Sequence, residues 1–161
     1  MRMNKDNACF TFDAACDAAI SMETQIYQKF LAAIRLVKDK AANEILQEAA
    51  TVRICIKQKL EMAALKGGIN QQEVTGAVPI MNLAHSIRCC DLQNIDSGAN
   101  NRKALAFAIQ MSKDALEFYR GMADQCSGAP MAELFRALGD DQTRHLQQLE
   151  DTYEEHFLPE G

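Results

Sequence analysis

The feature that most constrains the fold is an internal repeat, in which two stretches of the chain resemble each other at a constant offset of 89 residues. Residues 19–22 read Ala-Ile-Ser-Met, and residues 108–111 read Ala-Ile-Gln-Met. Residues 58–61 match residues 147–150 in the same register, without a gap. Two unrelated amphipathic helix pairs are the alternative, but such helices seldom keep one register over this length. The sequence therefore predicts one structural unit that occurs twice.

Each unit is predicted to be a pair of long helices. Apolar residues recur at spacings of three and four, which is typical of a helix with one buried face. The chain has only three prolines and eight glycines, and several of them lie between the two units. Gly67 and Gly68 are predicted to end the second helix, and residues 127–130 to form a tight turn before the fourth. The predicted helices cover residues 9–39, 41–66, 102–125 and 131–157, and residues 80–92 are a candidate for a short additional helix.

The connections between the helices predict the topology. The links inside each unit are short, so each unit is expected to be an antiparallel hairpin. The link between the units is too long for a hairpin and suits a crossover that runs the length of a bundle. The predicted fold class is all-α, a ferritin-like antiparallel four-helix bundle in one domain over residues 1–161. Its parts are a hairpin at 9–66, a crossover at 67–101 and a hairpin at 102–157.

Charge and hydropathy exclude some classes of function. The net charge is −5 and no extended basic patch occurs, so we expect no nucleic-acid partner. No run of eighteen apolar residues is present, so we expect no membrane span. Residues 1–7 lack the apolar segment of a signal peptide, and a cytoplasmic location is predicted.

The six cysteines contain no Cys-x-x-Cys pair, which excludes thioredoxin chemistry and the usual zinc-ribbon and rubredoxin spacings. In a reducing cytosol they are expected to act as small buried hydrophobic residues. Cys89 and Cys90 follow His85, and adjacent cysteines are poorly placed to bridge each other. A structural role is therefore favoured for them over a thiol-redox or metal-binding role.

Three helical phrases carry a resemblance to a known family, and they are residues 19–23 with Tyr27, residues 108–119, and residues 138–145. With these phrases, both hairpins resemble the rubrerythrin family of ferritin-like di-iron proteins. The resemblance lies in helical phrases and covers roughly two-thirds of the chain. It implies a bundle fold, a di-iron centre and an oxidoreductase activity.

The resemblance also implies where iron ligands should stand. In such proteins each hairpin supplies a glutamate from its first helix and a Glu-x-x-His motif from its second. Carboxylate oxygens and imidazole suit iron, and the spacing puts both motif residues on one helix face. Only two of the corresponding positions keep the family residue, Glu23 and His145. The full set of corresponding positions is Glu23, Arg53 and Ile56 in the first half, and Ser112, Gln142 and His145 in the second.

These substitutions oppose metal binding. Arg53 places a permanent cation where iron needs an anion, and Ile56 has no lone pair to offer. The additional glutamate that rubrerythrins carry corresponds to Ala115. A shift of one residue in the first half would select Val52 and Cys55, which also gives no Glu-x-x-His motif. We therefore predict that no di-iron centre forms and expect no cofactor.

The vacated centre is predicted to hold a layer of polar side chains in which Arg53 pairs with Glu23. Such a buried pair requires further hydrogen bonds, for which Ser112, Gln142 and His145 are candidates. The favoured interpretation is a structural network. A small-ligand pocket, in which Arg53 holds a carboxylate or another anion, is the less favoured alternative. A single metal ion on Glu23 and His145 is less favoured still, because two ligands seldom suffice.

Two functions follow from the sequence. The first is a non-catalytic binding or structural protein, ferritin-like and homodimeric through a helix face. The second is a rubrerythrin-type di-iron oxidoreductase, a peroxidase or an iron oxidase, with iron as its cofactor. The absence of a Cys-x-x-Cys rubredoxin module counts against the second. We therefore favour the first function.

Overall fold

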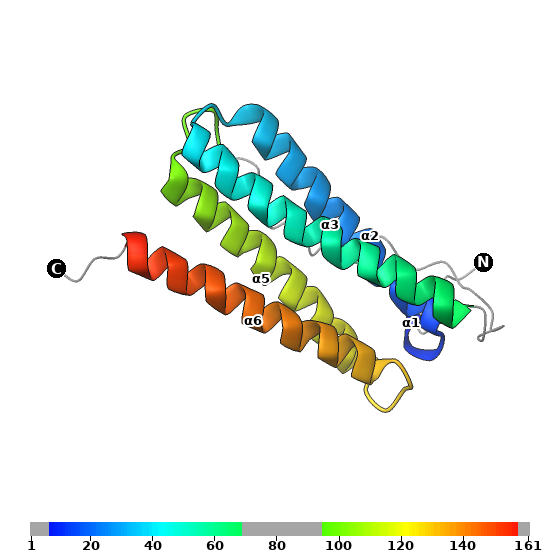
Figure 1. The fold of residues 1–161 in the computed structure, drawn as a ribbon. Coiled ribbons are helices and arrows are strands. Elements are labelled where there is room, and N and C mark those ends of the chain that lie inside the picture. Colours follow the sequence, from blue (N-terminus) through cyan, green and yellow to red (C-terminus); the bar gives the residue numbers. More distant parts are fainter. Residues whose placement is uncertain (1–6, 69–94, 158–161) are drawn as a thin grey trace.

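The computed structural model describes residues 7–68 and 95–157, and all regular secondary structure in these ranges is helical. The four long helices pack side by side as a bundle, which confirms the predicted all-helical class (Figure 1). Among the described helices, none is long and apolar enough to cross a membrane. The helices are α1 (Asn7–Phe10), α2 (Phe12–Leu36), α3 (Lys40–Gly68), α5 (Asn101–Gln125) and α6 (Ala132–Phe157).

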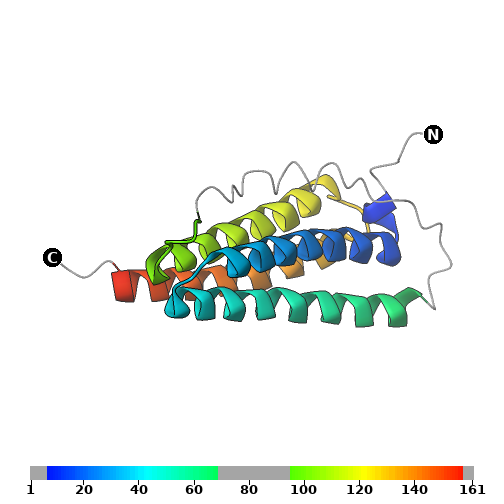
Figure 2. The same ribbon diagram turned by 90° about the horizontal axis from the view of Figure 1, so that it is seen from above.

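The helices form two antiparallel hairpins, α2 with α3 and α5 with α6 (Figures 1 and 2). Helix α3 ends and α5 begins at opposite ends of the bundle, as the predicted crossover topology requires. Most of the predicted crossover, residues 67–101, lies outside the described residues. The same is true of the candidate helix at 80–92 and of His85, Cys89 and Cys90.

The boundaries of the first hairpin differ from the prediction of an unbroken helix over residues 9–39. The chain is extended at Thr11, whose side chain accepts a hydrogen bond from the amide of Ala14 at 3.3 Å and so begins a new helix, α2. Helix α2 ends at Leu36, and Asp39 accepts a bond from the amide of Ala42 at 2.8 Å. Threonine and aspartate favour such caps because their oxygens satisfy the free amides of a first turn.

The second hairpin has nearly the predicted boundaries. Asn100 caps α5 by accepting a hydrogen bond from the amide of Lys103 at 3.0 Å. The turn before α6 contains Gly128 at a φ of 81°, a conformation that favours glycine. The amide of Ala129 closes this turn by donating to the carbonyl of Cys126 at 2.7 Å. The predicted turn at 127–130 is confirmed.

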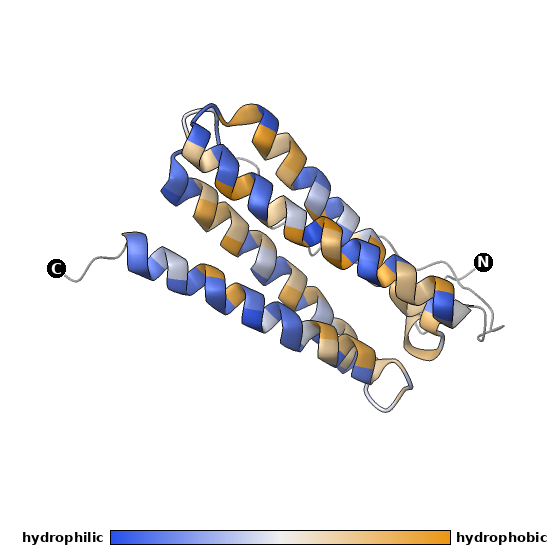
Figure 3. Cartoon of the chain, in the orientation of Figure 1, coloured by the Kyte–Doolittle hydropathy of each residue, from blue (hydrophilic) through white to orange (hydrophobic). Residues whose placement is uncertain are grey.

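The core lies between the helices and mixes small residues with a few large ones. Ala15, Ala18 and Ala19 are completely buried on α2, which lets the helices approach closely. Phe30 and Phe107 meet edge to face, with ring centroids 5.4 Å apart, and join α2 to α5. The visible side of α6 is mostly hydrophilic, whereas α5 shows more hydrophobic residues (Figure 3). The buried faces therefore hold the two hairpins together.

A disulfide between Cys9 and Cys126 corrects the prediction that the cysteines are only small buried hydrophobic residues. It ties α1 to the end of α5, beside the turn that leads into α6 (Figure 2). The amide of Met131 adds a hydrogen bond of 3.0 Å to the carbonyl of Cys9. The two cysteines are 117 residues apart in the sequence. The spacing of the cysteines therefore does not predict this disulfide, which forms only because α1 packs beside the end of α5.

Within the part of the chain that the structure describes, two other cysteines have free thiols. Cys16 is buried, as predicted, and burial together with Asp13 and Asp17 raises the pKa of its thiol to about 11. Cys55 is exposed on α3, against the prediction. Disulfides are most frequent in oxidising compartments, and the cytoplasmic location stays a prediction.

Candidate functional site

The candidate site is a layer of polar side chains in the middle of the bundle, to which each long helix contributes. Glu23 comes from α2, Arg53 from α3, Tyr119 from α5 and Gln142 from α6. These residues are at most 2% exposed to solvent. We call these four residues the polar layer. Three of them stand at positions that the sequence analysis singled out.

The centre of the polar layer is an ion pair. Nη1 of Arg53 donates to Oε1 of Glu23 at 2.9 Å and lies 3.3 Å from Oε2. The predicted pairing of these two residues is therefore present. Removing both charges from water is costly, and the pair is stable only if the remaining hydrogen-bonding atoms are also satisfied.

Gln142 provides one of these additional bonds. Its Oε1 accepts from Nη2 of Arg53 at 2.7 Å, across a sequence separation of 89 residues. That separation equals the offset of the repeat, so the two positions that correspond to each other in the two halves meet in the bundle. Nε2 of Gln142 has no hydrogen-bond partner among the described residues.

Tyr119 provides the other bond, and the sequence analysis missed it. Its hydroxyl donates to Oε2 of Glu23 at 2.6 Å. Burial and the neighbouring Glu23 raise the pKa of Tyr119 well above its usual value of 10, so the hydroxyl stays protonated and keeps donating. A tyrosine on an otherwise apolar helix face was the available signal, because a buried hydroxyl usually has a partner.

The other positions singled out from the sequence are buried or half-buried in the bundle. Ser112 is buried on α5, and Ala115 is completely buried one turn further along. Ile56 is half-buried and packs against the hydrophobic core. His145 is half-buried on α6 and lines a cleft between α3 and α6. Burial and the charge of Arg53 lower the pKa of His145 from 6.5 to about 4, so its imidazole is uncharged at neutral pH.

The residues of the polar layer do not fit a di-iron centre. A guanidinium nitrogen lies 2.9 Å from the only carboxylate of the layer, where it would repel a metal cation. Within residues 7–68 and 95–157, no group of three or more histidine, cysteine, aspartate or glutamate side chains is placed to hold a metal ion. Glu23 and Tyr119 are also at most 1% exposed, which leaves them out of reach of a substrate in solution.

Comparison of the chain with known protein families, with curated proteins and with solved structures finds no match. The resemblance to rubrerythrins therefore stays a prediction from the sequence phrases and the repeat.

Proposed function

We propose that this chain is a rubrerythrin-related, ferritin-like bundle in which an arginine–glutamate pair has taken the place of the di-iron centre. It then acts as a non-catalytic binding or structural protein. The observation that carries the proposal is the ion pair of Arg53 with Glu23, completed by Gln142 and Tyr119. Arg53 supplies the positive charge that iron supplies in a di-iron protein, so the buried carboxylate needs no metal.

The meeting of Arg53 and Gln142 also supports the ferritin-like part of the proposal. In a duplicated hairpin with a two-fold relation, corresponding positions approach each other at the axis. The Glu-x-x-His motifs of a di-iron bundle project inward from facing helices in this way. Here the first residues of the two corresponding motifs are in hydrogen-bond contact at 2.7 Å.

The first test is the metal content of the protein, measured by mass spectrometry after purification without chelator and again after anaerobic iron loading. The proposal expects almost no iron in either sample. About two irons per chain, with the absorption band of an oxo bridge, would instead favour the rubrerythrin-type oxidoreductase.

A second test rebuilds the ligand set in one variant. Arg53→Glu, Ile56→His, Ser112→Glu and Gln142→Glu would add the four missing ligands to Glu23 and His145. If the positions are assigned correctly, this variant binds about two irons per chain. The matched control keeps the substitutions of the second half and moves those of the first half by one residue, to Val52→Glu and Cys55→His. A rebuilt variant that folds but binds no more iron than this control would refute the ferritin-like assignment.

The predicted homodimer and the cytoplasmic location stay predictions. Light scattering coupled to gel filtration measures the mass of the particle in solution. A mass near twice the 17.9 kDa of one chain would support the dimer.

A further inference from the structure

Beside the polar layer, helices α3, α5 and α6 enclose a cleft of about 720 Å³. We call it the α3–α6 cleft. This volume lies within the range of sites that hold small organic molecules. Its walls are mainly apolar, and three of the wall residues, Ala49, Val52 and Leu149, come from the facing helices α3 and α6. Ile45, Leu105 and Phe157 complete the apolar lining.

The two ends of the α3–α6 cleft differ. At the inner end, His145 lines the wall one helical turn from Gln142. Val52 lines it directly before Arg53. At the outer end, Thr152 and His156 are exposed, near the start of α5 at Asn101. The inner end therefore meets the polar layer, and the outer end opens to solvent.

The charges around the cleft select against an ionised ligand. Among the described residues, Glu48 is the only carboxylate in the lining, and it disfavours an anion. Arg53 lies behind the inner end and disfavours a cation there, as its effect on His145 shows. A neutral imidazole has one nitrogen that accepts a hydrogen bond and one N–H that donates, and this N–H can bind a neutral acceptor on a ligand. A ligand that fits has an apolar body and one neutral hydrogen-bond acceptor.

From this arrangement we propose that the α3–α6 cleft binds a neutral, largely apolar small molecule whose carbonyl or other acceptor oxygen receives a hydrogen bond from His145. This site differs from an anion site on Arg53. Arg53 is 1% exposed, does not line the cleft, and already donates from both terminal nitrogens to Glu23 and Gln142. This proposal goes beyond the proposed function, and the two are tested separately. Iron content tests the proposed function, and ligand binding tests the α3–α6 cleft.

The test uses two fluorescent probes of similar size. The first is 6-propionyl-2-(dimethylamino)naphthalene, a neutral naphthyl ketone whose emission responds to polarity and to hydrogen bonding at its carbonyl. The second is 1-phenylnaphthalene, a neutral fluorescent hydrocarbon that has neither a hydrogen-bond donor nor an acceptor. Titration of the wild-type protein should give saturable binding of the ketone at about one site per chain.

Two cleft variants and one control locate the site. Ala49→Phe fills the cleft and should weaken binding of both probes by about tenfold or more. The control Ala106→Phe adds the same ring to a separate hollow on the outer side of α5 and α6, and should leave binding unchanged. His145→Phe keeps a ring of similar size but removes the donor. It should weaken binding of the ketone about fivefold and binding of the hydrocarbon hardly at all.

Each outcome decides a part of the proposal. Equal binding by wild type and Ala49→Phe, or no saturable binding by wild type, would overturn the site. Equal weakening of both probes by His145→Phe would overturn the hydrogen bond. If a variant fails to fold, nuclear Overhauser contacts in the wild-type protein between the bound ketone and the methyl groups of Val52 and Leu149 provide the answer. Their absence in the saturated complex would place the ketone elsewhere.

Discussion

The two hairpins put different residues at corresponding positions, and the difference explains how the polar layer is held together. The first hairpin carries both charges of the layer, Glu23 and Arg53. The second carries neutral groups that complete the hydrogen bonds, Gln142 and Tyr119. A charge pair within one hairpin neutralises itself locally, so the other hairpin needs only donors and acceptors. The corresponding pairs, 89 residues apart, are Glu23 and Ser112, Phe30 and Tyr119, Arg53 and Gln142, and Ile56 and His145.

The largest effect is expected where the charge pair of the first hairpin is broken. Arg53→Met leaves Glu23 buried without its counter-ion and should lower the free energy of unfolding by about 3–5 kcal/mol. Urea denaturation at neutral pH measures it. The double variant Glu23→Leu with Arg53→Met removes both charges and should recover at least half of the loss. If the double variant is as unstable as Arg53→Met, the loss of stability comes from altered side-chain packing and not from the unpaired charge of Glu23.

The next effect concerns the link between the chain start and the second hairpin. Replacing both Cys9 and Cys126 with serine removes a bridge across 117 residues and should cost about 2–4 kcal/mol. Thermal unfolding of the wild type, with and without reductant, should show a similar difference. The control Cys55→Ser removes a free, exposed thiol and should change little. A melting temperature that does not respond to reductant or to the double substitution would contradict a stabilising bridge.

Tyr119→Phe makes the second hairpin more like the first, which has Phe30 at the corresponding position. It removes the donor at 2.6 Å from Glu23 and should destabilise the protein by about 1–3 kcal/mol. The control Phe118→Leu changes the neighbouring ring, whose centroid lies 5.5 Å from that of Tyr119, but removes no hydrogen bond of the polar layer. The comparison is made by urea denaturation. If Tyr119→Phe acts through the hydrogen bond to Glu23, it should lower the free energy of unfolding by less when Glu23 is already replaced by leucine. An equal loss of stability in the Glu23→Leu background would refute the contribution of this hydrogen bond.

Asp114 gives the second hairpin a pH dependence. Its Oδ1 accepts from Gln110 at 3.1 Å, and its Oδ2 has no hydrogen-bond partner among the described residues. Burial and the nearby Glu117, opposed by Lys29, raise the pKa of Asp114 from 3.8 to about 7. The folded state therefore binds a proton that the unfolded state has released. The contribution of Asp114 to the stability of the folded state is fully present below pH 3.8 and is lost as the pH rises through 7.

Asp114→Asn removes this titration without changing the shape of the side chain. The free energy of unfolding of the variant, minus that of the wild type, should increase by on the order of 1 kcal/mol when the pH is raised from 5 to 8. Urea denaturation at both pH values measures the change. Asp124→Asn is the control, because Asp124 is an exposed aspartate near the end of the same helix. A difference between Asp114→Asn and wild type that does not vary with pH would contradict the raised pKa.

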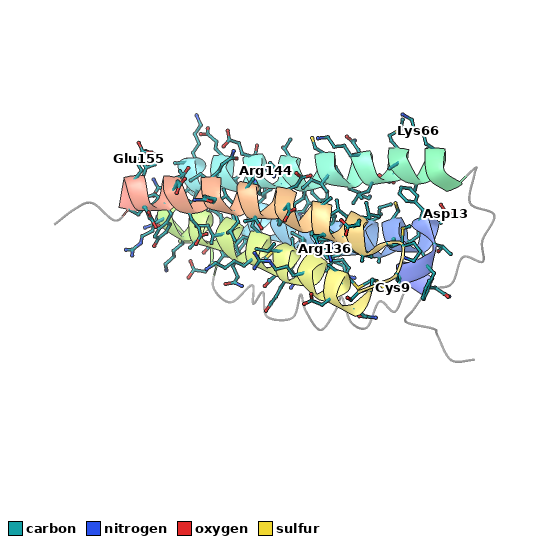
Figure 4. The ribbon with its side chains drawn as sticks, turned by 90° about the horizontal axis from the view of Figure 1, so that it is seen from below. Cys9, Asp13, Lys66, Arg136, Arg144 and Glu155 are labelled. Carbon is teal, nitrogen blue, oxygen red and sulfur yellow. A yellow bond between two sulfur atoms is a disulfide. The ribbon has the colours of Figure 1, made fainter. Side chains whose placement is uncertain are left out.

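The smallest effect is expected from a surface ion pair of the second hairpin. Arg136 pairs with Glu133 on the outer side of α6, where water and salt screen the charges (Figure 4). Arg136→Met should change the free energy of unfolding by no more than about 0.5 kcal/mol. The same substitution at Arg53 is expected to cost several times more. Similar losses at the two sites would remove the distinction between buried and exposed pairs.

The sequence predicted the regular parts of the molecule and failed where distant segments meet. The boundaries of α5 and α6 agree with the prediction to within one residue at each end, because periodicity, caps and the turn at 127–130 are local signals. The break at Thr11 was missed, since a single cap within a run of helix-forming residues gives a weak signal. The disulfide of Cys9 was missed because only the folded chain brings it to Cys126.

For the polar layer, the repeat in the sequence predicted which positions correspond, and the residue types predicted that Arg53 opposes metal binding. Both are properties of the sequence, because register and charge do not depend on packing. Only the tertiary structure decided that Arg53 points at Glu23 and Gln142, that Tyr119 completes the network, and that His145 faces the α3–α6 cleft. The physical reason is that hydrogen bonds and clefts depend on the distances between helices, and these are set when the buried faces of the two hairpins pack.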